Sequence, residues 1–587
     1  MITIINKNRI MRAALPFLTL SFLLLSVSSC SRLFDPETDD QIKESEYISS
    51  NTELYTGFIG IMTKVQAVGD KEILLTDTRA ELLEPTMNAT TELYNIYNYA
   101  DNLQGNSYAN PAGYYEVIVA CNDYLAKVFE YRTQPQVDQQ KCDNLIASTI
   151  RVKVWAYKTL GEIYGEAAWF DEPIGSVDAF LASGYELIGM EQIADKCLNL
   201  LEQGYKGVAA DGKINWIEWL DPEHINDIAN SPFRKWDYMV PAYEGLYAEL
   251  CLWKAAYLDG AGDNPSAKPY YKAAADILLA ALNTEIDNEG HSGNNPYWCP
   301  NAGTAGRYAN LWLAEDPYAP ENVSVILYDY ENKQINGLVK HFCADADYLL
   351  APAEGGEHNF LDKKKNPGAS TSETRYKNLI GNSGGNRYIA KFRGVGGRNG
   401  VRQYTYQDDV HIYVYRATQY HLMLCEALNN LARFTSMGCV LNKGITGANQ
   451  VDLVASDQDV KEGKAPNPEW EGFTRNWTTD AEWGTRKYPC AGVRGAFSLD
   501  DRVILTTQDA SLNDAKKHND IEIMREVILE HSCEGKTYPW MNRLAVRYND
   551  LSIIADEVCP KYEFSGQAEA IRAKILDGGN WVKYNLK

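Results

Sequence analysis

The sequence predicts a mainly α-helical protein, built from tetratricopeptide-like helix pairs with long irregular loop insertions. Apolar residues recur every three or four positions in six segments, which is the period of a helix that buries one face. Four of these segments form two close pairs, and a short turn separates the members of each pair. Such pairs cannot bury their apolar faces alone, so we expect them to stack into one array.

The first predicted pair covers residues 113–131 and 143–170. A loop that contains Pro135 separates the two helices and predicts an antiparallel hairpin. We expect Pro173 to stop the second helix, because proline cannot continue a helix.

The second predicted pair covers residues 239–258 and 269–283, with a turn rich in Gly, Asn and Pro at residues 260–265. Two further helices are predicted at residues 411–433 and 520–534 from the spacing of their apolar residues. The pairs are not contiguous in the sequence, so insertions must interrupt the array.

The predicted insertions lie near residues 284–410 and 438–510. Both stretches lack helical periodicity and are rich in Gly, Pro, Asn, Tyr and Trp. Long irregular segments in a compact body are usually functional, so we place the ligand surface mainly there. The whole of residues 46–587 is expected to form a single body with these insertions.

The N-terminus has the pattern of an export signal. Three basic residues precede a short apolar run at residues 13–25, and the run ends in Val27-Ser28-Ser29-Cys30. The run is shorter than the roughly 20 residues that a membrane-spanning helix needs. The pattern resembles a bacterial lipobox and predicts a signal peptide over residues 1–29, cleavage before Cys30 and lipidation of its sulfur. The alternative is an ordinary secretory signal followed by a chance cysteine.

A polar, acidic tether is predicted at residues 30–45, between the lipid and the body. The formal net charge is −23, and removal of residues 1–29 takes away three basic residues and no acidic ones, which leaves −26. So acidic a surface repels nucleic acid, and no nucleic-acid partner is expected. Of the twelve cysteines, eleven remain besides Cys30, and none forms a C-x-x-C pair. Cysteines such as Cys251 and Cys425 fall on apolar helix faces and are expected to be buried.

No motif in the sequence predicts catalysis, a metal or a cofactor. Residues 381–385 match G-x-S-x-G, but a predicted strand follows at residues 387–392, where a nucleophile elbow needs a helix. We therefore interpret this match as a glycine-rich turn. The many acidic pairs leave one enzymatic alternative open, a secreted glycoside hydrolase, although most of them are expected to form a solvated surface.

Three aromatic clusters are candidate ligand-binding sites. Aromatic rings stack on the apolar faces of sugars or on peptide side chains, and neighbouring Asn and Arg groups hydrogen-bond hydroxyls or carbonyls. The candidate residues are Tyr94, Tyr97 and Tyr99 from the first cluster, Tyr297, Trp298, Arg307 and Trp312 from the second, and Trp477 from the third.

Five segments, in this order, make the chain resemble SusD/RagB lipoproteins over nearly its whole length. They are residues 75–82, 120–125, 151–165, 415–429 and 528–538. The last is the most specific, because it is similar to the family's E-R-x-x-E-L-x-x-E-G-x-R-x-x-D-L-x-R signature. The chain departs from the family pattern at positions that we expect to be structural, namely Cys425, Ser532, Thr537 and Pro539-Trp540.

The resemblance implies a SusD-like binding protein and no enzyme. It implies that the body is held at the cell surface by a lipid in the outer membrane. It also implies a partner, a SusC-like TonB-dependent transporter, which receives the captured ligand. The Trp and Tyr clusters favour a neutral oligosaccharide, because flat rings cover the faces of sugar rings. Peptide binding, as in RagB-like proteins, is the alternative.

Overall fold

The protein is described from a computed structural model, which covers most of the predicted body. The described residues are 48, 50–135, 137–174, 185–203, 236, 238–284, 322–361, 374–392, 408–442, 493–494 and 499–585. The predicted signal peptide, Cys30 and the tether lie outside them.

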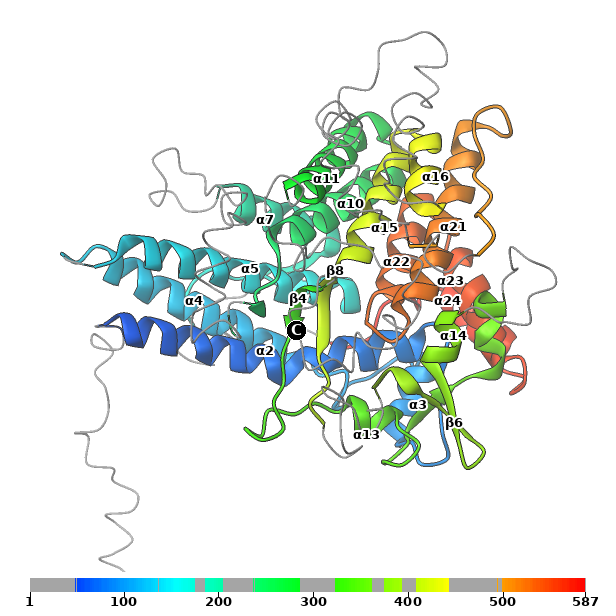
Figure 1. The fold of residues 1–587 in the computed structure, drawn as a ribbon, viewed down its shortest axis with the longest axis horizontal. Helices are drawn as coiled ribbons and strands as arrows, with labels where there is room; N and C mark the ends of the chain where they lie inside the picture. Colours follow the sequence, from blue (N-terminus) through cyan, green and yellow to red (C-terminus); the bar gives the residue numbers. More distant parts are fainter. Residues whose placement is uncertain are drawn as a thin grey trace, which may run out of the picture.

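Long helices stack side by side and form most of the molecule (Figure 1). From α2 to α16 the long helices contact one another in the order of the chain, α21 packs on α15, and α22 folds back onto the middle of the array, where it packs on α10. The helices are α2 (Asn51–Arg79), α4 (Ala112–Arg132), α5 (Gln139–Tyr164), α7 (Met190–Gln203), α10 (Tyr243–Gly260), α11 (Asn264–Thr284), α15 (Ala417–Asn430), α16 (Phe434–Asn442), α21 (Leu512–His531), α22 (Thr537–Tyr548), α23 (Ser552–Val558) and α24 (Ala568–Leu576).

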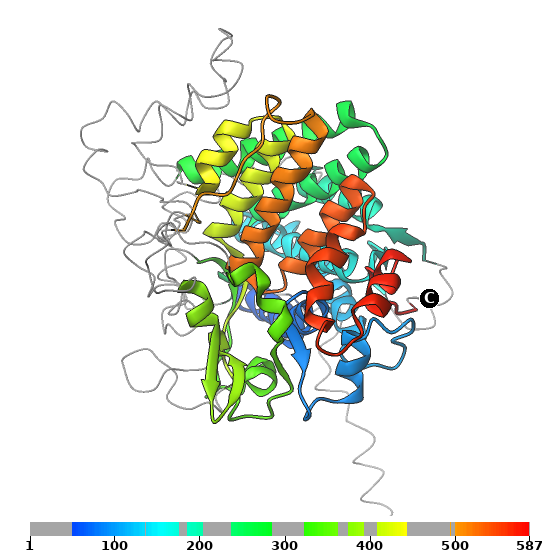
Figure 2. The same ribbon diagram turned by 90° about the vertical axis from the view of Figure 1, so that its right-hand side faces the viewer.

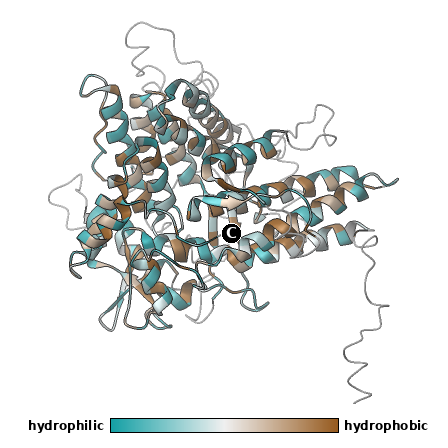
Figure 3. Cartoon of the chain, turned by 180° about the vertical axis from the view of Figure 1, so that it is seen from behind, coloured by the Kyte–Doolittle hydropathy of each residue, from teal (hydrophilic) through white to brown (hydrophobic). Residues whose placement is uncertain are grey.

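The predicted helix pairs are confirmed as α4 with α5 and α10 with α11. Small residues allow close packing between helices. A Cβ atom added at Gly161 of α5 would lie 2.2 Å from the Met190 sulfur of α7, so a larger residue there would force the Met190 side chain to move. Figure 3 shows apolar and polar residues alternating along the helices, as expected for helices that bury one face. The tetratricopeptide-like, mainly helical fold is therefore confirmed.

The end of α5 differs from the prediction. The helix ends at Tyr164 rather than near Pro173, because Gly165 adopts the left-handed conformation, with φ of 76°, and terminates the helix. The chain then enters a short strand, β2 (Glu166–Ala168), which pairs with β3 (Leu187–Gly189). The Gly165 signal is visible in the sequence, but the apolar residues beyond it extend the helical pattern.

The predicted helix at residues 411–433 is wrong over its first turn. Its first residues form a strand, β8 (Ile412–Arg416), and α15 begins only at Ala417. The strand pairs antiparallel with β4 (Asn322–Ile326) and every residue of it is buried. The predicted helix at residues 520–534 is confirmed over residues 520–531 as part of α21, which begins earlier, at Leu512, where Ser511 caps it, and ends at His531.

The first insertion holds more regular structure than its sequence predicts. Within the described residues it contains short helices and strands that lie below the helix array, next to α3 (Thr91–Tyr97) (Figure 2). These elements are α13 (Leu338–Phe342), β5 (Leu350–Pro352), η4 (Glu354–Leu361), α14 (Thr374–Leu379), β6 (Ile380–Ser383), β7 (Asn386–Ile389) and η5 (Ala390–Phe392), where η marks a 3₁₀ helix.

Two of these strands form a hairpin, β6 with β7, and Gly384 and Gly385 at its turn have φ of 60° and 91°. Positive φ favours glycine, which explains the pair. The interpretation of residues 381–385 as a glycine-rich turn, and not a nucleophile elbow, is confirmed.

None of the described helices combines the length and apolar composition of a membrane span. The nine cysteines in the described ranges are all buried, including Cys251 and Cys425, as predicted.

Candidate functional site

The first aromatic cluster divides between surface and core. Tyr94 on α3 keeps 38% of its surface exposed, whereas Tyr97 keeps 7% and Tyr99 only 2%. The other candidate residues, Tyr297, Trp298, Arg307, Trp312 and Trp477, lie outside the described residues. Among the predicted ligand-binding residues that the structure describes, Tyr94 is therefore the exposed one.

The prediction that Tyr97 and Tyr99 face a ligand is corrected by their packing. The Tyr97 ring lies 4.5 Å from the Tyr562 ring, between centroids, and 4.8 Å from the Lys561 ammonium group. Tyr99 lies 4.0 Å below the Arg79 guanidinium group and donates its hydroxyl proton to the Arg79 carbonyl at 2.7 Å. Tyr99 packs on the end of α2 and Tyr97 packs on Lys561 and Tyr562; both rings are buried, so they cannot stack on a ligand.

Tyr94 belongs to an exposed surface, which we call the α3 face, formed by Met87, Asn88, Thr91, Tyr94 and Asn95. The Tyr94 hydroxyl donates to the Thr86 carbonyl at 2.9 Å, which fixes the ring over the β1–α3 turn, where β1 is Leu83–Pro85. An exposed ring with exposed amide side chains next to it in the chain can stack on a sugar and hydrogen-bond its hydroxyls.

A hydrogen-bonded Tyr–His pair, which the sequence does not predict, supports the N-terminal end of α3. The Tyr108 hydroxyl lies 2.9 Å from Nε2 of His341, and the same hydroxyl interacts with the side chain of Thr90, the N-cap of α3. Nδ1 of His341 lies 2.5 Å from the Gly337 carbonyl and must donate to it, so Nε2 accepts from Tyr108. Burial lowers the pKa of His341, which favours this neutral ring.

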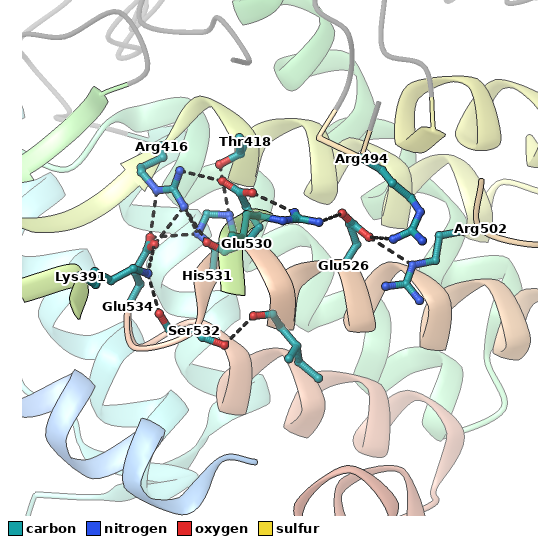
Figure 4. A network of polar contacts seen from close by, with 12 residues as sticks. Lys391, Arg416, Thr418, Arg494, Arg502, Glu526, Glu530, His531, Ser532 and Glu534 are labelled. Atoms are coloured by element: carbon teal, nitrogen blue, oxygen red, sulfur yellow. Dashed lines mark hydrogen bonds and ion pairs between the residues drawn. The ribbon is translucent and has the colours of Figure 1, made fainter. Parts of the chain in front are cut away.

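A buried polar network lies behind this region (Figure 4). Its centre is the glutamate stripe, Glu526, Glu530 and Glu534, which are spaced four residues apart and all buried; the first two lie on α21 and Glu534 lies in the turn after it. Arg375 on α14 bridges the first two carboxylates at 2.8 and 3.0 Å. Arg416 on β8 bridges the second and third at 3.0 and 2.9 Å.

Other cations complete the network from separate parts of the chain. Lys391 on η5 contacts Glu534 at 2.7 Å, and Arg494 and Arg502 contact Glu526 at 2.9 and 3.1 Å. Burial alone would raise the pKa of Glu526, but the surrounding arginines hold it well below its ordinary value. These glutamates are thus paired with cations inside the molecule, and the expectation of a solvated acidic surface is wrong for them.

Asp77 fixes the turn that follows the glutamate-bearing helix. Its carboxylate accepts the backbone N–H groups of Cys533 and Gly535 at 2.9 and 2.7 Å. Both of these residues have positive φ, 63° and 75°, so the turn needs an external acceptor for its outward-facing N–H groups. Because Asp77 and Gly535 lie in two of the segments that resemble SusD/RagB proteins, this contact gives the resemblance a physical basis.

The described residues show no arrangement that predicts catalysis by a metal. Within the described ranges, no group of three or more His, Cys, Asp and Glu side chains is placed to hold a metal ion. The ionised groups of the network are saturated with opposite charges and lie in the core. They serve the fold, and the exposed α3 face is the candidate for binding.

The array of helix pairs with insertions defines a tetratricopeptide-like helical protein, and solved structures place it more closely. A SusD superfamily protein of Bacteroides vulgatus matches with a TM-score of 0.55 at 12% identity, over 91% of this chain and 95% of its own. A SusD homologue of Bacteroides thetaiotaomicron matches with 0.53 at 13%, over 91% and 97%. NanU of Bacteroides fragilis matches with 0.50 at 14%, over 89% and 94%.

The chain therefore has the SusD fold over nearly its whole length, and the SusD-like resemblance predicted from the sequence is confirmed at the level of the fold. Sequence identity to these proteins is only 12 to 14%, so the similarity lies in the fold. Comparison with known family profiles and with curated proteins finds no match.

Proposed function

We propose that the chain is a cell-surface nutrient-binding protein. In this proposal it captures a neutral oligosaccharide and delivers it to a SusC-like TonB-dependent transporter in the outer membrane. The main support is the SusD fold over 91% of the chain. One solved structure with this fold, from Bacteroides fragilis, is described as a SusD-like carbohydrate-binding protein, with a TM-score of 0.50 at 12% identity. The α3 face adds an exposed ring with amide groups beside it.

The proposal includes binding without catalysis. A binding protein needs an exposed face with stacking and hydrogen-bonding groups, and the α3 face has both. A glycoside hydrolase needs two carboxyl groups that flank a sugar at about 5 to 10 Å from each other. The buried carboxylates described above are engaged by arginines and lysines, which supports a structural role for them.

We expect Tyr94→Ala to weaken oligosaccharide binding by about 1–2 kcal/mol, roughly five- to thirtyfold, because the variant loses one stacking ring. The sequence predicts the same for Trp298→Ala and Trp312→Ala, by about 1–3 kcal/mol each. Affinity electrophoresis and calorimetry against α-glucan, β-glucan, mannan and xylan oligosaccharides would measure it, with a tryptic peptide pool alongside.

Phe129→Ala is the matched control, because Phe129 is also an exposed ring, 36%, but lies on α4. Wild-type affinity in the Tyr94 variant would remove the α3 face from the site. Saturable binding of peptides alone would replace the oligosaccharide with a peptide ligand. Turnover of any glycan, abolished by one carboxylate-to-amide change, would overturn the proposal of a binding protein.

Membrane attachment is proposed to depend on Cys30 alone. Cys30→Ala should release the protein into the soluble fraction, because two or three acyl chains anchor a protein stably and none remain in the variant. Fractionation of cells with palmitate labelling measures this. Cys121→Ala, at a buried position, is the control and should stay in the membrane fraction. Palmitate label on the Cys30 variant would contradict the prediction.

A further inference from the structure

The α3 face is connected to the buried glutamate stripe by a rigid piece of the first insertion. This piece, residues 374–392, runs from α14 through the β6–β7 hairpin to η5, and we call it the β6–β7 strut. Each of its ends is held by a buried cation. Arg375 at its start binds Glu526 and Glu530, and Lys391 at its end binds Glu534.

Lys391 links the strut to the turn after α21, whereas Arg375 links it to the helix itself. Its ammonium group donates to the Ser532 carbonyl at 2.6 Å and to the Glu534 carboxylate at 2.7 Å, and its side chain is buried. A buried ion pair adds little net stability, because desolvation of the charges offsets their attraction. Its particular effect is directional: the ammonium group must lie where the two acceptors meet, which fixes η5 relative to α21.

From the strut, hydrogen bonds lead to Tyr94 in three steps. The Arg387 carbonyl on β7 accepts from the Tyr348 hydroxyl at 2.5 Å. The Tyr348 carbonyl accepts from the Thr86 hydroxyl at 2.5 Å, and the Thr86 carbonyl accepts from the Tyr94 hydroxyl at 2.9 Å.

Strand contacts follow the same path. β7 packs against β5, and β5 pairs with β1, with Leu83 opposite Pro352 and Pro85 opposite Leu350. The N–H of Thr86 extends this pairing by donating to the Leu349 carbonyl at 2.9 Å. The turn that carries the α3 face therefore rests on the strut through both backbone and side-chain bonds.

We propose that Lys391 is a positioning residue for Tyr94, which fixes the orientation of the α3 face through the β6–β7 strut without contact with the ligand. A binding ring must be held close to its productive geometry by the groups behind it, so a loose strut lowers affinity while the exposed residues stay unchanged. The inference deepens the proposed function, because it assumes that the α3 face binds the ligand.

The test compares Lys391→Met with Lys158→Met. Both lysines are 2% exposed and paired with buried glutamates, but Lys158 on α5 binds Glu162 and Glu249 at 2.6 and 3.0 Å within the helix array. Hydrogen–deuterium exchange of the full chain is measured over residues 83–98. We expect Lys391→Met to speed exchange there at least threefold and Lys158→Met to leave it unchanged.

A second variant tests the hydrogen bonds between the strut and Tyr94 and leaves the buried ion pairs of the glutamate stripe unchanged. Tyr348→Phe removes only the hydroxyl that bonds Arg387 and should also speed exchange over residues 83–98. Affinity for the same four classes of oligosaccharide should fall at least threefold in Lys391→Met and Tyr348→Phe. Neither substitution should lower the affinity further in a protein that already carries Tyr94→Ala.

The outcomes separate the two proposals. Unchanged exchange over residues 83–98 in both Lys391→Met and Tyr348→Phe would overturn the positioning role, as would equal effects in Lys158→Met. If Lys391→Met does not fold, Tyr348→Phe decides alone. If no oligosaccharide binds the wild type, the proposed ligand fails, whereas the exchange measurement still decides whether Lys391 orients the α3 face.

Discussion

Replacement of Asp77 by Asn is expected to destabilise the protein by about 3 kcal/mol. The Asp77 carboxylate accepts two backbone N–H groups, from Cys533 and Gly535, in a fully buried place. An Asn side chain offers one oxygen and turns an NH2 group towards the second N–H. One buried donor is then left without an acceptor, which costs about 1–3 kcal/mol, and the charge-assisted bonds are lost as well. Urea unfolding at pH 7 measures the change.

Asp123→Asn is the matched control for this experiment. Asp123 is also a helical aspartate, on α4, but its side chain is 45% exposed and pairs with Lys127 at 3.1 Å. Exposed ion pairs contribute little, so the control should lose less than about 0.5 kcal/mol. A loss below about 1 kcal/mol in Asp77→Asn would show that the turn after α21 holds its conformation without this acceptor.

The helix array was predictable because its signal is local. The apolar residues of α4, α10 and α11 recur at the helical period, and each helix needs only its own sequence to show it. β8 has no such signal. All of its residues are buried, so apolar and polar positions do not alternate, and its sequence cannot be distinguished from the helix that follows.

The candidate site was predictable only in part, because burial is decided by distant residues. Tyr94 and Tyr97 are three positions apart on α3, but Tyr562, 465 positions further along the chain, covers the second. Glu530 has the four-residue spacing of a solvated acidic face, and only Arg375 and Arg416, 155 and 114 positions away, make it a core residue. No local pattern carries that information.

Glu81, next to the turn that Asp77 holds, is expected to be a neutral acid in the folded protein. Its Oε1 lies 3.3 Å from the Ser532 hydroxyl oxygen, but that hydroxyl has one proton and lies only 2.5 Å from the Ile528 carbonyl. The Ser532 proton therefore goes to Ile528, and the contact with Glu81 needs a proton from Glu81 itself. The other oxygen of Glu81 has no hydrogen-bond partner among the described residues.

Burial raises the pKa of Glu81 from 4.5 to about 7, in agreement with this hydrogen-bond pattern. Burial also raises the pKa of Asp77 to about 7, and an ionised Glu81 beside it would add to that rise, so the two carboxyl groups do not both carry a charge. The two backbone donors favour the ionised form of Asp77, whereas the charge of Glu81 would be stabilised by one backbone donor, its own N–H, and by the more distant Lys561 charge. The proton of the pair therefore resides on Glu81.

We expect Glu81→Gln to stabilise the protein by about 3 kcal/mol at pH 8 and by almost nothing at pH 4.5. Between its unfolded pKa of 4.5 and its folded pKa of about 7, Glu81 holds a proton only in the folded state. The wild type then loses about 1.4 kcal/mol of stability for each pH unit as the pH rises through this window. Glutamine is neutral at every pH, and its amide donates to Ser532 as the acid does, so the variant lacks this loss.

Glu557→Gln should show the opposite dependence and serves as the control. Despite its burial, bonds with His358, at 3.1 Å, and Arg525, at 3.0 Å, lower the pKa of Glu557 to about 2. Its charge stabilises the fold above pH 4.5, and that contribution is lost as the pH falls towards 2. Glu557→Gln should therefore be destabilised at pH 8, where Glu81→Gln is stabilised. Urea unfolding of the wild type and both variants from pH 2 to 8 covers both windows, and a wild-type slope between pH 4.5 and 7 in Glu81→Gln would place the proton elsewhere.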